Sequence, residues 1–351
     1  MKLTSKIAAV VLAVCLAVSL CACGSDTTWI SEYAGTTLPA GVYNLYLTAE
    51  YSNALSKVAS DAEIKDIYKA DVEGTPLNEA VTAAAKEDIR EHYAVLKMFD
   101  DMGLSLSESE LLGIEAQADN MWGDGKSYEA HGVARSSLTA YLEAVAKRGA
   151  IFRAIYGPGG EKEISEADLK AAFDDTYYAA MYVARATVDT STGEPLDSAA
   201  LKENTDYLEG LKKRADEGAD FFELVLEDET KKLEANGQDT SSLKDVTAND
   251  FTYIVEKTNT VYFPAEMMTA LGEMKNDEVR MVTASSMNIL LKKLDLLSIQ
   301  EAYDARVDTL RNSLKGEEFN AMISEAASAI EPSFNEKSLS RYTAKSLNLG
   351  K

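Results

Sequence analysis

Apolar residues recur at helical spacing along residues 41–160, and this periodicity most constrains the fold of the chain. In residues 82–99 the apolar positions follow one helix face, and residues 136–156 repeat the pattern. Between these two helices, Ser107 with Glu110 three residues later predicts a capping box that opens another helix. Amphipathic helices joined by short breaks must pack on one another, so this region is expected to form an all-helical unit.

The periodicity changes in the middle of the chain, where strands are expected. Residues 178–188 alternate apolar and polar side chains as a strand does, and residues 287–294 predict a final strand. A helix is expected through residues 199–217 between them. Strands and helices in this order are typical of a small α/β domain.

A helical pattern returns from residue 298, with Tyr303, Leu310 and Phe319 among its aligned apolar residues. A lone amphipathic helix needs a partner for its apolar face, and the N-terminal helical unit is the expected one. The expected class is therefore α+β and mainly helical, with a small α/β domain inserted into a helical lobe that the N- and C-terminal segments form together. The expected boundaries are 41–165 for the N-terminal helical domain, 166–297 for the inserted domain and 298–351 for the C-terminal segment.

The first 22 residues are interpreted as an export signal. Lys2 and Lys6 precede an uncharged apolar run of 14 residues, which suits the h-region of a signal peptide and is short for a membrane span. The residues that close the run, Leu20-Cys21-Ala22-Cys23, resemble the lipobox of bacterial lipoproteins. The resemblance implies that Cys23 receives diacylglycerol, becomes the first mature residue and anchors the protein to the outer, extracytoplasmic face of a bacterial membrane.

Composition excludes several function classes. The 35 basic and 58 acidic side chains give a net charge of −23, which becomes −23 minus 2, or −25, when Lys2 and Lys6 are removed with the signal. Such a charge repels polyanions, so no nucleic acid is expected as a partner. Cys23 is the one cysteine left after cleavage, which excludes a disulfide within the mature chain and metal sites of the paired-cysteine kind. No cofactor or metal is expected, and residues 23–40 are interpreted as a tether.

Three stretches resemble bacterial foldase lipoproteins of the PrsA type and the related periplasmic chaperone SurA. Residues 87–110 resemble the family's helix, turn and capped helix, and residues 138–175 resemble the helix that leads into its inserted domain. Residues 218–224 (GADFFEL) resemble the G-A-D-F-x-E-L segment of parvulin prolyl isomerases. The resemblance implies a SurA-like helical chaperone lobe, an inserted parvulin-like domain, and unfolded or exported polypeptides as partners.

The parvulin resemblance also implies where catalysis would occur, and this chain departs from the family there. Active parvulins carry a histidine in the first strand and another in the last strand, where this chain has Ala186 and Asn288. The family's proline-gripping Phe and Met are matched by Phe263 and Met267, four residues apart in a predicted short helix over residues 261–271. Both could equally be core residues of any small domain. The domain is therefore interpreted as a degenerate parvulin.

The two histidines of the chain and its first tyrosines have simpler interpretations beside the functional ones. His92 is interpreted as a core histidine and His131 as a solvated loop residue. Tyr43, Tyr46 and Tyr51 fall at near-helical spacing, which suits either a groove for apolar client segments or the packing of the lobe's first helix.

The expected function is a membrane-anchored extracytoplasmic chaperone or foldase that assists exported proteins, with prolyl isomerase activity weak or lost. One alternative is an active parvulin-type peptidyl-prolyl cis-trans isomerase, which the replaced histidines disfavour. The other is a solute-binding lipoprotein of a transporter, which needs two α/β lobes and conflicts with the helical pattern of residues 41–160. The acidic charge would favour basic clients.

Overall fold

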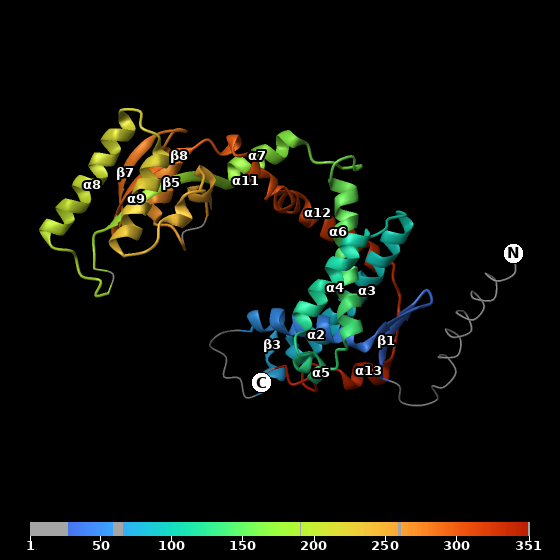
Figure 1. Cartoon of the computed structure of the whole chain (residues 1–351). Coiled ribbons are helices and arrows are strands. Elements are labelled where there is room, and N and C mark those ends of the chain that lie inside the picture. The colour runs from blue at the N-terminus through green and yellow to red at the C-terminus, as the bar shows by residue number, and fades with distance from the viewer. Residues whose placement is uncertain (1–26, 59–65, 190, 259–260, 350–351) are drawn as a thin grey trace. The chain divides into compact units, whose positions relative to one another are not determined.

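The computed structural model describes residues 27–58, 66–189, 191–258 and 261–349, and they form two units (Figure 1). The first unit takes in the chain up to residue 163 and from residue 315 onward, and the second unit is residues 164–314. The α+β, mainly helical class is confirmed. The expected signal peptide and Cys23 lie outside the described residues. Within the described part of the chain, no helix is both long and apolar enough to cross a membrane.

The first unit is built on helices α2, α3, α4 and α6, which pack side by side (Figure 1). The predicted capping box at the start of α4 is confirmed: the Glu110 backbone N–H donates to Ser107 Oγ at 3.2 Å, and the Ser107 N–H donates to Glu110 Oε2 at 2.8 Å. The elements before the second unit are β1 (Trp29–Tyr33), β2 (Thr36–Pro39), α2 (Ala40–Ser56), the 3₁₀-helix η1 (Ile67–Lys69), β3 (Asp71–Val72), β4 (Thr75–Pro76), α3 (Leu77–Asp101), α4 (Glu108–Trp122), α5 (Lys126–Ala130) and α6 (Arg135–Tyr156).

The prediction of a tether over residues 23–40 is wrong for residues 29–39, which form the antiparallel β1–β2 hairpin. Ala34 and Gly35 at its tip have positive φ angles of 49° and 82°, as a two-residue hairpin turn of type I′ requires. Ile30 is fully buried and Leu38 is 4% exposed, so the hairpin is part of the core. A tether would leave both apolar side chains in water, which costs free energy that packing recovers.

The C-terminal segment completes the core of the first unit. β9 (Ser333–Phe334) pairs with β1, giving the sheet order β2-β1-β9, and α13 (Glu336–Arg341) follows it. Ile330 and Leu339 belong to the same hydrophobic cluster as residues of α2 and α3. Residues more than 200 positions apart in the sequence therefore share one core, as 330 minus 89 shows for Ile330 and Ile89.

The second unit contains an antiparallel four-stranded sheet of order β6-β5-β8-β7, with helices on both of its faces. Helices α8 and α9 pack on one face, and α10 packs on the other. The strands predicted at 178–188 and 287–294 are confirmed, as is the helix at 199–217, whereas the shorter β6 and β7 were not predicted. The elements are α7 (Glu166–Thr176), β5 (Tyr177–Ala186), α8 (Ser198–Asp216), α9 (Phe221–Ala235), η2 (Ser241–Leu243), η3 (Ala248–Phe251), β6 (Tyr253–Glu256), α10 (Ala265–Glu273), β7 (Val279–Thr283), β8 (Met287–Leu294), η4 (Leu296–Ser298) and α11 (Gln300–Asp304).

The boundary expected at residue 298 is wrong, because residues 298–314 belong to the second unit. Tyr303 packs against Phe173 with ring centroids 5.6 Å apart, and its hydroxyl donates to Glu166 at 3.0 Å. Phe319, further along α12 (Val307–Ser328), instead packs against Phe152 of α6 at 5.2 Å. The continuous helical periodicity hid the boundary, because it does not show which partner each turn contacts.

Candidate functional site

The two positions at which active parvulins carry histidine, Ala186 and Asn288, lie on opposite faces of the sheet. The β5–β8 pairing sets Ala186 opposite Met287 and Arg185 opposite Asn288. Residues that face each other across antiparallel strands point to the same side, and neighbours along a strand point to opposite sides. Ala186 therefore lies on the face that α10 covers, and Asn288 on the face that α8 and α9 cover. The structure does not bring the two positions together.

Phe263 and Met267 do contribute to one cluster, but not by sharing a helix face. Helix α10 begins at Ala265, so Phe263 precedes it and the expected i, i+4 arrangement is wrong. Both side chains nevertheless pack in the hydrophobic cluster between α10 and the sheet. Met267 is 1% exposed, which makes it a core residue, whereas Phe263 is half-buried at the surface.

A row of three aromatic side chains, Tyr182, Tyr253 and Phe263, lies on this same face and is called the aromatic row below. The Tyr182 and Tyr253 rings are 4.9 Å apart, and Tyr253 meets the Phe263 ring edge-on at 6.0 Å. Tyr253 is 41% exposed, so the row reaches solvent. Burial raises the pKa of Tyr182 to about 12, so its hydroxyl stays protonated at neutral pH.

The strand ends beside the aromatic row carry only small or apolar side chains. Ala184 and Ala186 of β5 and Met287 of β8 share its face by the alternation of the strands. None of these side chains can donate or accept a proton. This face can therefore contact an apolar or proline-containing segment, but those three positions supply no acid or base to it.

The opposite face of the sheet contains a buried charged cluster centred on Asp228, which is 1% exposed. Arg185 pairs with this carboxylate, the Tyr207 hydroxyl donates to it at 2.9 Å, and Lys232 Nζ lies 2.9 Å away. Burial opposes ionisation of Asp228, yet the bonds from Arg185 and Lys232 hold its pKa below the usual value. The Arg185 guanidinium also stacks over Tyr207 at 4.4 Å. These bonds join Tyr207 of α8 and Asp228 of α9 to Arg185 of β5, so the cluster fastens α8 and α9 to the sheet.

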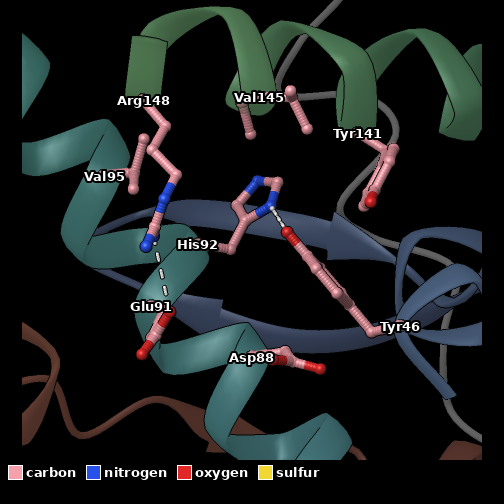
Figure 2. Close-up of a pocket in the computed structure, with 9 residues that line it drawn as sticks. Tyr46, Asp88, Glu91, His92, Val95, Tyr141, Val145 and Arg148 are labelled. Carbon is pink, nitrogen blue, oxygen red and sulfur yellow. Dashed lines mark hydrogen bonds and ion pairs between the residues drawn. The ribbon is translucent and has the colours of Figure 1, made fainter. Parts of the chain in front are cut away.

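The first unit holds a cavity of about 200 Å³ between α2, α3 and α6 (Figure 2). Its most buried polar side chain is His92, 3% exposed, which lies in the middle of the lining residues in Figure 2. The Tyr46 hydroxyl and His92 Nδ1 form a hydrogen bond of 3.1 Å. Val145 stands at the rim and is 49% exposed. The lining residues are Tyr46, Asp88, Glu91, His92, Val95, Tyr141, Ala144, Val145 and Arg148.

The cavity shifts the pKa values of its titratable groups in opposite directions. Burial, and then the nearby carboxylates of Glu50 and Glu91, raise the pKa of Asp88 from 3.8 to about 7. Burial, and then the charge of Lys147, lower the pKa of His92 from 6.5 to about 4. His92 is therefore neutral at pH 7, and Asp88 is poised between its two protonation states.

The arginine of the cavity is held by partners other than Asp88. Arg148 Nη1 donates to Glu91 at 3.4 Å and Nη2 donates to Asn320 Oδ1 at 2.9 Å, and the guanidinium lies over the Phe319 ring at 5.4 Å. Ser324 donates to the other oxygen of Glu91 at 2.6 Å. Glu91 and Arg148 thus form a satisfied pair that links α3 and α6 to the C-terminal segment.

The structure separates the tyrosines that the sequence grouped together. Tyr43 is fully buried and Tyr51 is 4% exposed, so both pack the core, whereas Tyr46 lines the cavity. The interpretation of His92 as a core histidine agrees with its burial. The sequence analysis did not single out Asp88. Its position four residues before His92 places both side chains on the same helix face, and this spacing was the signal that could have identified it.

No metal-binding group of three or more His, Cys, Asp or Glu side chains occurs within the described ranges. No family model and no curated protein matches the chain. By structure it is similar to the foldase protein PrsA of Streptococcus pneumoniae (TM-score 0.37, 15% identity, covering 76% of this chain and 92% of that one). It is also similar to PrsA of Lactococcus lactis (0.36, 13%, 91% and 98%) and of Bacillus subtilis (0.29, 15%, 77% and 91%). All three TM-scores are below 0.5, so the function of this chain is inferred below from its own side chains.

Proposed function

We propose that this protein is an extracytoplasmic foldase of the chaperone kind, which binds unfolded exported polypeptides and has weak or no prolyl isomerase activity. The observation that carries the proposal is the aromatic row of Tyr182, Tyr253 and Phe263, open to solvent at Tyr253. Aromatic surface of this kind contacts apolar side chains and proline rings of any sequence, as a binder of unfolded chains must. The lack of an imidazole at the neighbouring strand ends favours holding over catalysis.

The membrane anchor on Cys23 is part of the same proposal. The apolar run of residues 7–20 and the lipobox-like residues that follow support it. Two acyl chains give stable anchoring, because each buried methylene contributes about 0.8 kcal/mol. With Cys23→Ala we expect the protein to leave the membrane fraction for the soluble extracytoplasmic fraction; retention in the membrane would contradict a lipid anchor at this residue.

The proposal is tested with the mature chain carrying Cys23→Ala in two assays, one for suppression of aggregation of a chemically unfolded client and one for cis-trans isomerisation of Xaa-Pro peptides. We expect suppression at stoichiometric ratios and no acceleration of isomerisation above the uncatalysed rate, whose barrier is near 20 kcal/mol. Failure to suppress aggregation, together with failure to bind an unfolded chain, would refute the chaperone function. Fast isomerisation would revive the active-parvulin alternative.

The aromatic row is tested with Tyr253→Ala and Phe263→Ala in the same aggregation assay. Loss of exposed aromatic area should weaken client binding about tenfold for the pair, while Tyr253→Phe retains binding because the ring remains. Leu297→Ala is the matched control, since Leu297 is 47% exposed in the same unit but outside the row. An equal effect of the control would mean that general surface hydrophobicity, not the row, binds clients.

A further inference from the structure

The cavity of the first unit contains the carboxylate of Asp88, whose charge is only weakly compensated. Burial and three neighbouring carboxylates raise its pKa, and Arg148 alone lowers it, with the smallest effect of the groups that act on it. Asp88 has no hydrogen bond and no ion pair in the described part of the chain, although it lines the cavity and is half-buried (Figure 2). Burying a charge without a partner costs free energy. The negative charges of Glu50, Glu91 and Glu87 add to that cost. A cation placed in the cavity would relieve it.

The chain's own cations near the cavity are held elsewhere. Arg148 is bonded to Glu91 and Asn320 and lies over Phe319, as described above. Lys147 lies over the Phe99 ring at 5.4 Å. His92 is neutral, because its pKa is lowered to about 4. The carboxylate of Asp88 therefore faces the cavity without a competing internal ion pair among the described residues.

The aromatic walls of the cavity suit a cation as well. Tyr46 and Tyr141 meet edge to face with ring centroids 5.2 Å apart, and both line the cavity with Asp88. The electron-rich face of a tyrosine ring attracts an ammonium or guanidinium group, and the attraction grows when water is excluded. A carboxylate beside two tyrosine rings is a suitable set of groups for binding a positively charged side chain.

The size and position of the cavity further restrict the kind of group that can bind in it. Pockets for drug-sized ligands and cofactors enclose roughly 300–1,000 Å³, whereas this one encloses about 200 Å³. It fits one long side chain rather than a cofactor. Val145 at the rim is 49% exposed, so a side chain can enter from solvent. The net charge of −23, or −25 once Lys2 and Lys6 are removed with the signal, attracts basic segments to the molecule at long range.

We infer that the cavity lined by Asp88, Tyr46 and Tyr141 binds a cationic side chain of an unfolded client. This inference rests on the proposed function, since it adds a selective contact for basic residues to the non-selective aromatic row. The ammonium or guanidinium group pairs with the Asp88 carboxylate and lies against the tyrosine rings, and the aliphatic stem lies along Val95 and Val145.

Binding of matched fluorescent peptides to the mature chain carrying Cys23→Ala tests the inference. The peptides share one extended apolar sequence and carry lysine, arginine or acetyllysine at a single position. We expect the lysine and arginine peptides to bind about tenfold more tightly than the acetyllysine peptide at low ionic strength, with the difference shrinking as salt is added. Equal affinities of all three peptides would overturn the inference.

Asp88→Asn should abolish the preference for the charged peptides and leave the acetyllysine peptide unaffected. The matched control is Asp100→Asn, the same change on an exposed residue of the same helix, which should retain the preference. Val145→Arg places a cation at the rim of the cavity and should also abolish the preference. Thermal unfolding of each variant confirms that it is folded. An unchanged preference in folded Asp88→Asn would overturn the inference.

Two further comparisons distinguish a free amine from a client side chain as the ligand, and failure of this inference from failure of the foldase function. A free alkylamine that displaces the lysine peptide at similar concentration would assign the cavity to small amines rather than to client side chains, and would overturn the inference. If the protein suppresses client aggregation but does not distinguish lysine from acetyllysine, the inference fails and the foldase function stands. If it does neither, the foldase function itself fails.

Discussion

The aromatic row of the second unit and the cavity of the first unit both expose tyrosines, but they differ in what lies beside them. Beside the row the strands carry Ala184, Ala186 and Met287, whereas the buried ion pairs of Asp228 with Arg185 and Lys232 lie on the opposite face. Lys293, which shares the face of the row, donates to the backbone carbonyls of Leu271 and Met274. Beside the cavity tyrosines lies Asp88, a carboxylate with no hydrogen bond or ion pair among the described residues. The comparison teaches that one surface is suited to apolar contact alone and the other to a charged group.

The largest effect is expected from Asp228→Ala, which breaks the cluster that fastens α8 and α9 to the sheet. Removing the carboxylate leaves the largely buried charge of Arg185 without its partner, so the second unit should lose about 3–5 kcal/mol of its free energy of unfolding. Both tryptophans, Trp29 and Trp122, lie in the first unit. Denaturation should therefore show an earlier transition by circular dichroism and an unchanged one by tryptophan fluorescence.

The control for that change is Asp216→Ala, which breaks an exposed pair with Lys212 at 2.7 Å. Exposed pairs contribute about 0–1 kcal/mol, so this variant should unfold nearly as the wild type does. A similar loss of the free energy of unfolding in both variants would mean that the buried cluster does not stabilise the sheet that carries the aromatic row.

The next effect is expected from Ile330→Ala in the C-terminal segment, which supports the unit that contains the cavity. Ile330 is 3% exposed and packs in the core with residues of α2 and α3. Truncation of a buried isoleucine costs about 2–4 kcal/mol. The tryptophan transition should move to lower denaturant, the reverse of the pattern for Asp228→Ala. A shift seen only by circular dichroism would contradict the shared core.

A smaller effect is expected from Asp88→Asn, and it depends on pH. The pKa of Asp88 is about 7 in the folded chain and near 3.8 when unfolded, so the folded state binds more protons between these values and stability falls as pH rises through them. The variant removes this loss and should be more stable than wild type by about 1 kcal/mol at pH 8, with no difference near pH 4. Thermal unfolding followed by tryptophan fluorescence across this range measures it.

His92 contributes the opposite slope and provides an internal check. Its pKa is lowered to about 4, so the unfolded state binds more protons between pH 4 and 6.5, and the stability that neutral burial provides is lost as pH falls through this range. In Asp88→Asn only the effect of His92 remains, so the free energy of unfolding should increase as the pH rises from 4 to 6.5. The charged and titratable groups that line the cavity with these two residues are Tyr46, Glu91, Tyr141 and Arg148. Glu50, Glu87 and Lys147 act on the pKa values of the two residues from outside the lining. An unchanged pH profile in the variant would contradict the charge assigned to Asp88.

The smallest effect is expected from placing histidines beside the aromatic row. Ala186→His with Asn288→His puts the two rings on opposite faces of the sheet, and isomerisation of Xaa-Pro peptides should stay at the uncatalysed rate. Ala186→His with Met287→His puts both on the face of the row and can raise the rate slightly. A larger gain from the Asn288 pair than from the Met287 pair would contradict the register of β5 and β8.

Local patterns predicted most of the regular elements correctly. Helical periodicity and the capping box of Ser107 and Glu110 depend on residues a few positions apart, so α3, α4 and α6 could be recognised from the sequence. The strand at Met287–Leu294 was also found, because its apolar run is long enough to show. The short β6 and β7 gave no such signal, and the hairpin of residues 29–39 was missed because its turn was interpreted as a linker.

The sequence by itself determined the fold class, the insertion of one domain into a helical lobe, and the acidic charge, because these follow from composition and from contacts close along the chain. Only the tertiary structure decided that Ala186 and Asn288 lie on opposite faces, since strand register depends on pairing between distant segments. It also decided that Phe319 and Tyr303 belong to different cores, and that Asp88, Tyr46 and Tyr141 share a cavity. Three helices bring these last residues together, and packing between helices cannot be read from the periodicity of any one of them.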